Sequence, residues 1–243
     1  MKEVVRMKNK RKIILLVILL LTLIVLGVLL FLNLNKEDEK TNINTDAVKF
    51  KEEYESLNGS EASNGYTYPG VALEDNNSFV YSSVDDAIKV LENGTGIIYF
   101  GYSSCPWCRN AVNVLQHVNT NEILYVDMSD QRDTYEVIDG VLTKTKDGTD
   151  GYYKLLELLD SVLEDYVVDG ISTGEKRMYI PLVVGVKEGE IVGSHEATVD
   201  LNEGQTAYDT LTNDQQEELK DVYDEIASKV NANVCDIDSN KGC

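Results

Sequence analysis

The chain has 243 residues, with 42 acidic and 22 basic side chains and a formal net charge of −20. An acidic surface of this kind repels phosphate backbones and anionic headgroups, which argues against a nucleic-acid partner. About 200 residues follow the first apolar run, which is enough for one domain with a proper core.

A run of twenty uncharged, mostly apolar residues from Ile13 to Leu32 comes first. At ~1.5 Å per residue it spans a hydrocarbon core of ~30 Å. It is too long for a cleavable signal peptide and lacks a small-x-small cleavage site. Six basic residues and one acid precede it, which holds the N-terminus in the cytoplasm. We therefore predict a cytoplasmic segment 1–12, a single-pass cell-membrane anchor 13–32 and an extracytoplasmic remainder.

Residues 33–77 are predicted to form a tether and a docking helix. Residues 33–45 are polar and lack apolar periodicity, as expected of a tether. The next apolar residues, Ala47, Phe50, Tyr54 and Leu57, recur at helical spacing. A short helix that packs on the main domain is the expected result.

The main domain is predicted at 78–230 and begins with the order β-α-β-α-β. Strands are predicted at 78–81, 97–100 and 123–126, and the apolar run 97–100 suits a strand buried on both faces. Ser83 with Asp86 resembles a capping box that opens a helix through Leu91. A second helix follows the cysteines Cys105 and Cys108. This alternation indicates an α/β fold.

An insertion is predicted at about 128–178, before the core pattern resumes. Its apolar residues from Tyr152 to Tyr166 follow helical spacing, which predicts one amphipathic helix. Residues 179–186 and 190–199 then predict a β-hairpin. A final helix is expected from Asp214 to Val230, with Thr212 as its cap.

The sequence Cys105-Pro106-Trp107-Cys108 carries the strongest chemical signal. A thiol-disulfide exchange centre needs one sulfur that attacks as a thiolate and a second that resolves the mixed disulfide. At the start of a helix, unpaired N–H groups and the helix dipole lower the pKa of the first thiol. Cys105 is therefore the expected nucleophile and Cys108 the resolving thiol, while Pro106 suits the first helical turn.

The four cysteines allow two other interpretations. A purely structural disulfide is disfavoured because such bridges seldom follow a buried strand and open a helix. A zinc site with Cys235 and Cys243 is disfavoured because seven residues separate those two. In the tail, 231–243, an oxidising compartment favours a Cys235–Cys243 disulfide instead. No metal and no cofactor are expected.

Residues 78–230 contain, in this order, a strand, CPWC, a helix, Ile180-Pro181, a hairpin and a terminal helix. In the order of these elements, residues 78–230 resemble the thioredoxin superfamily. The resemblance implies a central mixed sheet flanked by helices. It implies that Pro181 follows a cis peptide bond beside the cysteines and that the backbone of Ile180 pairs with the substrate chain. Trp107 is either a hydrophobic platform for the substrate or a half-buried rim residue.

The anchor and the oxidising side further resemble extracytoplasmic bacterial thiol-disulfide oxidoreductases, including bacteriocin transport accessory proteins. The implied partners are protein or peptide thiols and disulfides and a membrane or extracytoplasmic redox partner. The alternative is a non-catalytic accessory protein of a peptide export system with an inert CxxC bridge.

Two features depart from the thioredoxin pattern, and the role of Arg109 is open. Many thioredoxins have a buried acid six residues before the first cysteine, where this chain has Tyr99. The separation of Cys105 from Pro181 is about thirty residues longer than in a minimal thioredoxin, which the insertion explains. Arg109 either supports a thiolate at Cys105 or is simply solvated.

Overall fold

The computed structural model describes Thr22 and residues 45–232. The chain divides into two units, Met1–Ile43 and Asn44–Cys243, and the fold described below belongs to the second. Within the described residues, no helix combines the length and apolar character needed to cross a membrane. The predicted anchor at 13–32 lies outside them, apart from Thr22.

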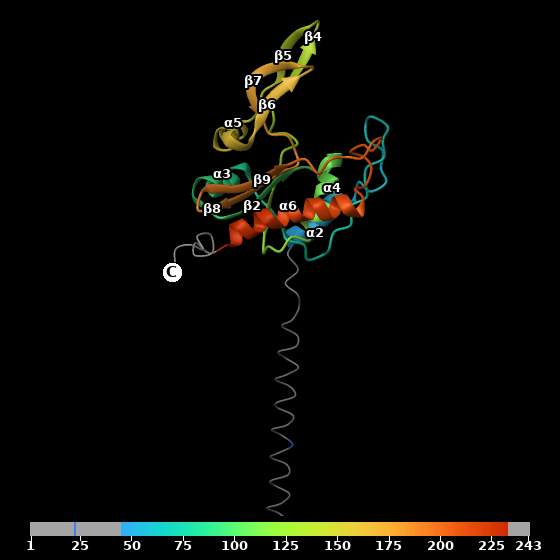
Figure 1. Cartoon of the computed structure of the whole chain (residues 1–243), viewed down its shortest axis with the longest axis vertical. Coiled ribbons are helices and arrows are strands. Elements are labelled where there is room, and N and C mark those ends of the chain that lie inside the picture. The colour runs from blue at the N-terminus through green and yellow to red at the C-terminus, as the bar shows by residue number, and fades with distance from the viewer. Residues whose placement is uncertain (1–21, 23–44, 233–243) are drawn as a thin grey trace, which may run out of the picture. The chain divides into compact units, whose positions relative to one another are not determined.

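A five-stranded mixed sheet forms the centre of the second unit, in the order β1-β3-β2-β8-β9 (Figure 1). Strand β3 pairs in parallel with β1 and β2, whereas β8 pairs antiparallel with β2 and β9. The predicted class, α/β with a central mixed sheet, is confirmed. The strands are β1 (Phe79–Tyr81), β2 (Gly96–Gly101), β3 (Ile123–Asp127), β8 (Leu182–Lys187) and β9 (Glu190–Glu196).

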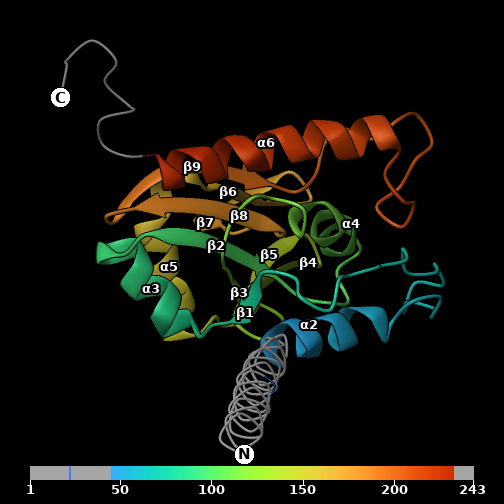
Figure 2. The same ribbon diagram turned by 90° about the horizontal axis from the view of Figure 1, so that it is seen from below.

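Helices cover both faces of this sheet (Figure 2). Ile97 and Tyr99 of β2 face a core cluster shared with α2, α4 and α6, while Ile98 and Phe100 face a cluster shared with α3 and α5. The alternation follows from the two-residue period of a strand. The helices are α2 (Thr45–Glu55), α3 (Val84–Asn93), α4 (Pro106–Leu115), α5 (Asp150–Leu158) and α6 (Asn213–Asn231).

The capping signals and the docking helix are confirmed. Ser83 accepts a hydrogen bond from the Asp86 N–H at the start of α3. Thr212 and Gln215 form a reciprocal capping box at the start of α6. Helix α2 packs on β1, where the Phe50 and Phe79 rings stack with centroids 4.0 Å apart.

The predicted helix from Tyr152 to Tyr166 is wrong in its second half. Helix α5 ends at Leu158, a 3-10 turn η1 (Asp160–Val162) follows, and Tyr166 belongs to a strand. Leu163 and Tyr166 are buried as the periodicity indicated, but the backbone there is extended. Periodicity alone does not distinguish a helix from a strand when the apolar stretch is short.

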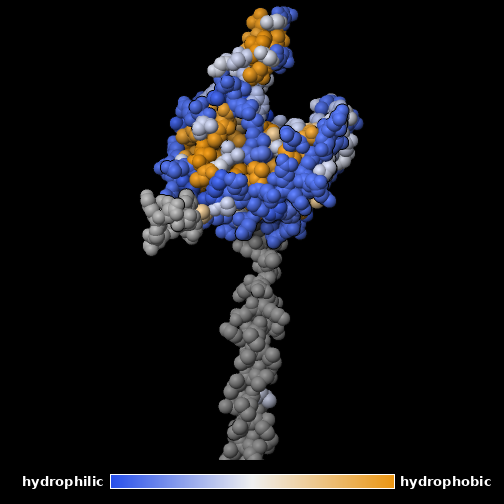
Figure 3. All heavy atoms as spheres, viewed as in Figure 1, coloured by the Kyte–Doolittle hydropathy of each residue, from blue (hydrophilic) through white to orange (hydrophobic). Residues whose placement is uncertain are grey.

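The rest of the insertion consists of two β-hairpins that sequence reasoning missed: β4 (Thr134–Ile138) with β5 (Val141–Lys146), and β6 (Glu164–Val168) with β7 (Ile171–Arg177). Figure 1 shows both hairpins projecting from the sheet. Four side chains near the two turns are exposed, and Figure 3 shows hydrophobic surface on this projection. They are Ile138, Val141, Val167 and Ile171.

Candidate functional site

The two cysteines lie where the buried strand β2 passes into helix α4. Cys105 is the N-cap of α4 and Pro106 is its first residue, as predicted. Proline fits there because the first helical N–H has no intrahelical acceptor to lose. The Cys105 Sγ accepts a hydrogen bond from the Cys108 N–H at 3.3 Å. The helix start therefore directs an N–H donor at the first sulfur.

The loop before β8 faces the same sulfur. The Ile180–Pro181 peptide bond is cis, as the resemblance implied. The Cys105 thiol lies 3.9 Å from the Ile180 carbonyl oxygen, to which it donates. Pro181 is buried and Ile180 is half-buried. The structure thus brings together four of the predicted site residues, Cys105, Cys108, Ile180 and Pro181.

Both thiols are covered, and both are free in this structure. Cys105 is 5% exposed and Cys108 is 0% exposed. The expected order of exposure holds, but Cys105 is less open than its place at the end of a strand suggested. Trp107 is half-buried and packs against the core cluster of α2, α4 and α6. This placement is that of a rim residue, and a role as a hydrophobic platform for the substrate stays a prediction.

The surroundings lower the pKa of Cys105. The largest cause is a hydrogen bond from the Cys108 thiol, and burial opposes it. Backbone N–H groups of Cys108 and Trp107 and the positive charge of Arg132 lower the pKa further. The Cys105 anion is thus stabilised by a helix start, a neighbouring thiol and a cation.

The same surroundings raise the pKa of Cys108 well above its ordinary value. Burial is the largest cause, followed by the hydrogen bond to Cys105 and the charge of the Cys105 thiolate. The Tyr102 N–H and the Tyr99 hydroxyl lower this pKa in part. The two thiols therefore differ in the direction expected of a nucleophile and a resolving thiol.

Arg132 is the site cation, and sequence reasoning missed it. Its guanidinium lies 5.8 Å from the centroid of the Tyr102 ring and donates to the Met178 carbonyl at 3.4 Å. The residue comes from the start of the insertion, and no motif or periodicity marks it. Only the folded loop brings it to Cys105.

Arg109 fills neither of its predicted roles. The side chain is 0% exposed and its guanidinium donates to the carbonyls of Pro69, Tyr54 and Ser103 and to Asn58 Oδ1. Burial in this position lowers the pKa of Arg109. Its charge is used to fasten residues 54–69 to helix α4.

Asn110 has a parallel role on the other side of α4. Its amide donates to the carbonyls of Ala207 and Asp209 and its Oδ1 accepts from the Leu211 N–H. The two residues after Cys108 therefore bind the two loops that flank the start of the helix. These contacts set the surroundings of the cysteines without touching the sulfurs.

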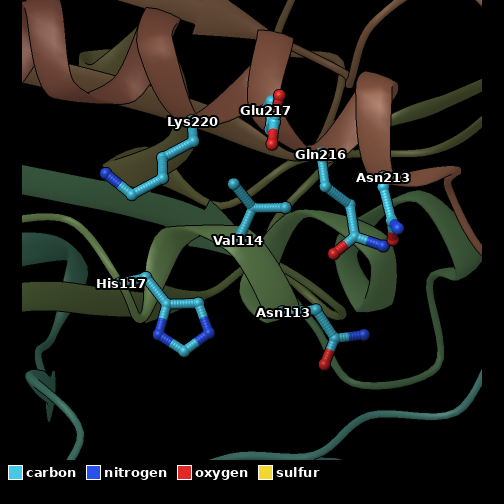
Figure 4. Close-up of a pocket in the computed structure, with 7 residues that line it drawn as sticks. All are labelled: Asn113, Val114, His117, Asn213, Gln216, Glu217 and Lys220. Atoms are coloured by element: carbon cyan, nitrogen blue, oxygen red, sulfur yellow. The ribbon is translucent and has the colours of Figure 1, made fainter.

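A surface pocket of about 250 Å³ lies between α4 and α6, away from this site (Figure 4). His117 and Asn113 line it from α4 and the turn after it, opposite Gln216 and Lys220 of α6. Lys220 is paired with Asp224. Neither cysteine borders the pocket, so it is separate from the thiol chemistry.

The predicted tail disulfide, Cys235–Cys243, lies outside the described residues. Comparison with protein-family models and with curated proteins finds no match for this sequence. Function must therefore be inferred from the chemistry of the site.

Proposed function

We propose that the chain is a membrane-anchored, extracytoplasmic thiol-disulfide oxidoreductase of thioredoxin-like fold that exchanges disulfides with protein or peptide substrates. The observation that carries the proposal is the placement of two adjacent thiols at the start of α4. The Cys105 sulfur accepts the Cys108 N–H and faces the Ile180 carbonyl, while Cys108 is fully buried. The pKa of Cys105 is lowered at a helix start, whereas the pKa of the buried Cys108 is raised. One reactive and one shielded sulfur are what a two-step exchange requires.

In the first step, the Cys105 thiolate attacks one sulfur of a substrate disulfide. The substrate S–S bond breaks, a Cys105–substrate disulfide forms and one substrate thiolate leaves. In the second step, Cys108 attacks the Cys105 sulfur and releases the second substrate thiol. The protein is then oxidised by two electrons and the substrate is reduced. Running the steps backwards oxidises the substrate instead, and a redox partner resets the pair.

The Ile180–Pro181 segment suits substrate binding in this scheme. The Ile180 carbonyl faces Cys105 at 3.9 Å from Sγ, so a backbone bound along this segment would lie next to the nucleophile. Pairing of an extended substrate with such a backbone is recognition by main-chain hydrogen bonds. The positive charge of Arg132, which lowers the pKa of Cys105, would support the thiolate.

Replacing the resolving thiol tests the proposal. A Cys108→Ala variant should remain covalently attached to its substrates, because the second step is lost. The attached proteins should appear as bands on non-reducing gels that disappear with a reductant, and mass spectrometry should identify them. These partners would also give the substrate class.

The matched control is Cys105→Ala, which should capture none. A glutathione titration of the unmodified pair should give a reduction potential above about −300 mV, the range of exchanging disulfides. Capture by neither variant, together with a lower potential, would favour an inert bridge in an accessory protein.

A further inference from the structure

Three buried tyrosines from three different elements share a core cluster with Cys108. Tyr54 comes from α2, Tyr99 from β2 and Tyr223 from α6, and all belong to the core cluster that contains both cysteines. Tyr54 and Tyr99 are 0% exposed and Tyr223 is 1% exposed. The ionisation of each is sensitive to the charge of Cys108. We call these three residues the tyrosine cluster.

The Tyr223 hydroxyl has no hydrogen-bond partner among the described residues, although it is buried. Its nearest aromatic neighbour, His195, meets it edge to face at 5.8 Å between ring centroids. His195 Nε2 is itself hydrogen-bonded to the Thr198 carbonyl. Buried hydroxyls almost always have a partner, so an orphaned one calls for an explanation. An anionic Cys108 would supply the acceptor.

The other two hydroxyls form a pair. The Tyr54 and Tyr99 oxygens are 2.9 Å apart. One hydroxyl donates to the other, which leaves one hydrogen of the pair free. When Tyr54 donates to Tyr99, the Tyr99 hydrogen is the free one, and a hydrogen bond from the Tyr99 side chain lowers the pKa of Cys108.

The other groups near Cys108 do not remove this need for donors. On its own helix, Arg109 is directed at backbone carbonyls, and Cys105 adds a negative charge when ionised. Just after β2, the Tyr102 N–H donates to Cys108. The Glu53 carboxylate of α2 accepts from Tyr81 and Tyr125 instead. Cys108 is thus left with hydroxyl and N–H donors.

We propose that Tyr99 and Tyr223 donate hydrogen bonds to the Cys108 thiolate during the resolving step, and that Tyr54 holds Tyr99 in the donating orientation. This inference rests on the proposed function. Tyr99 and Tyr223 are then catalytic residues and Tyr54 is a positioning residue.

The proton balance of the step needs no buried base. Cys108 loses its proton and attacks the Cys105 sulfur, the Cys105–substrate bond breaks, and the proton ends on the released substrate thiol. The tyrosines keep their own protons throughout, because burial raises the pKa of all three. They stabilise the charge on sulfur only while it exists.

An aromatic disulfide with a coloured leaving thiolate, dithiobisnitrobenzoate, separates the two steps. Attack by Cys105 releases one coloured thiolate, and resolution by Cys108 releases the second. Stopped-flow absorbance should show two phases in the full protein and only the first in Cys108→Ala. The pH profile of the second phase reports the ionisation of Cys108.

Tyr99→Phe and Tyr223→Phe should each slow the second phase at neutral pH by about tenfold or more, the factor for one hydrogen bond to a charged group. Each should also move its pH midpoint upward. Tyr54→Phe should do so more weakly. The first phase should change by less than about twofold, because no tyrosine of the cluster donates to Cys105.

Tyr125→Phe is the matched control. Tyr125 is equally buried and stacks on Tyr99 with centroids 5.7 Å apart, but its hydroxyl donates to Glu53. An unchanged second phase in both Tyr99→Phe and Tyr223→Phe would overturn the proposal. An equal slowing in Tyr125→Phe would reduce the effect to packing and overturn it as well.

A second measurement does not depend on exchange. In a Cys105→Ala background, the carbon-13 shift of labelled Cys108 Cβ can be followed against pH by NMR. Removing Tyr99 or Tyr223 hydroxyl should raise the midpoint, and an unmoved midpoint would contradict the proposal. Absence of the first stopped-flow phase in the full protein would instead contradict the proposed function, while this titration still decides the role of the tyrosines.

Discussion

At the residue scale, the charge that acts on Cys105 comes from Arg132 and not from the arginine next to the cysteines. Arg132 is held in place by its neighbour, because the buried Asp133 accepts from Arg177 Nη1 at 2.6 Å. Arg177 Nη1 also donates to the Asp133 carbonyl at 2.6 Å. This pair fixes the loop at the base of the hairpins, so the insertion contributes directly to the thiol site.

Arg132→Gln should raise the pKa of Cys105, because the variant removes a positive charge that lowers it. At a pH below the Cys105 pKa, the variant then has a smaller fraction of thiolate than the unmodified chain. Alkylation by iodoacetamide near pH 7 should therefore slow severalfold. Well above the pKa the two proteins should react alike. The measurement is the alkylation rate as a function of pH.

Arg132→Lys is the matched control, since it keeps the charge and should keep most of the reactivity. If Arg132→Gln gives the unmodified profile, the charge of Arg132 does not act on Cys105.

The site residues that sequence could supply are those with a local signature. Cys105, Pro106 and Cys108 follow from a strand that runs into a helix, and Ile180-Pro181 from its place before a hairpin. Arg109 was expected either at Cys105 or in solvent, and it is in neither place. A side chain as long as arginine reaches several partners, and only the folded loop around 54–69 determines which ones it meets.

At the element scale, the predicted strands of the central sheet and the helices α3, α4 and α6 agree closely with the structure. In the insertion, the helix predicted from Tyr152 is too long, and the two hairpins were not predicted. In the β4–β5 turn, Asp139 has a φ of 51° and Gly140 a φ of 79°. In the β6–β7 turn, Asp169 has a φ of 50° and Gly170 a φ of 78°. These belong to two-residue hairpin turns, for which Asp-Gly is a strong sequence signal. Both Asp-Gly pairs are present in the sequence. The strands on either side of each turn are polar and lack the alternation of apolar and polar residues that would predict a hairpin.

The third turn of this kind, between β8 and β9, allows a test of what glycine contributes. Gly170 and Gly189 have φ values of 78° and 81°. A Cβ at Gly170 would meet nothing within 4 Å, whereas one at Gly189 would lie 2.5 Å from the Glu92 carbonyl oxygen. Gly170→Ala should lower the free energy of unfolding by about 1 kcal/mol, the cost of a left-handed alanine.

Gly189→Ala should lower the free energy of unfolding by more than Gly170→Ala does. The atom that the new Cβ would meet is a backbone oxygen of Glu92, so helix α3 must move as well. Urea unfolding midpoints of the two variants provide the comparison. Equal losses would mean that α3 accommodates the extra carbon freely.

At the scale of the whole molecule, the α/β class and the docking of α2 followed from residue patterns, but the way distant segments combine at the site did not. Tyr54 lies 45 residues before Tyr99 in the sequence, yet the two hydroxyls are hydrogen-bonded. Neither the packing of α2 against β1 nor the register of β2 with β8 is encoded in a local motif. Such contacts depend on the assembled core.

A buried carboxyl at the end of β9 couples the insertion to the sheet. Glu196 pairs with Leu182 in the β8–β9 ladder, and its Oε2 is buried without a hydrogen-bond partner in the part of the chain that the structure describes. Burial raises the pKa of Glu196 to about 7, and the charge of Glu164 on β6 adds to the effect. The Tyr179 N–H acts in the opposite direction.

This raised pKa predicts a stability that falls as pH rises. Between its ordinary value of 4.5 and about 7, Glu196 holds a proton in the folded chain more often than in the unfolded one. The free energy of unfolding therefore declines across this window. The Glu196 contribution should be about 1–2 kcal/mol, because partial exposure screens the charge. Glu196→Gln should remove it, so that the variant gains stability relative to the unmodified chain as pH rises from 4.5 to 7.

Urea unfolding at a series of pH values measures the difference between the two proteins. Glu190→Gln, at an exposed position of the same strand, is the control and should leave the slope with pH unchanged. Glu164→Gln removes a charge that helps to raise the Glu196 pKa. The upper end of the pH range over which stability falls should therefore move to a lower pH. The free energies of unfolding of Glu196→Gln and of the unmodified chain could instead differ by the same amount at every pH from 4.5 to 7. Ionisation of Glu196 would then cost the fold nothing, and Glu196 would not couple the insertion to the sheet.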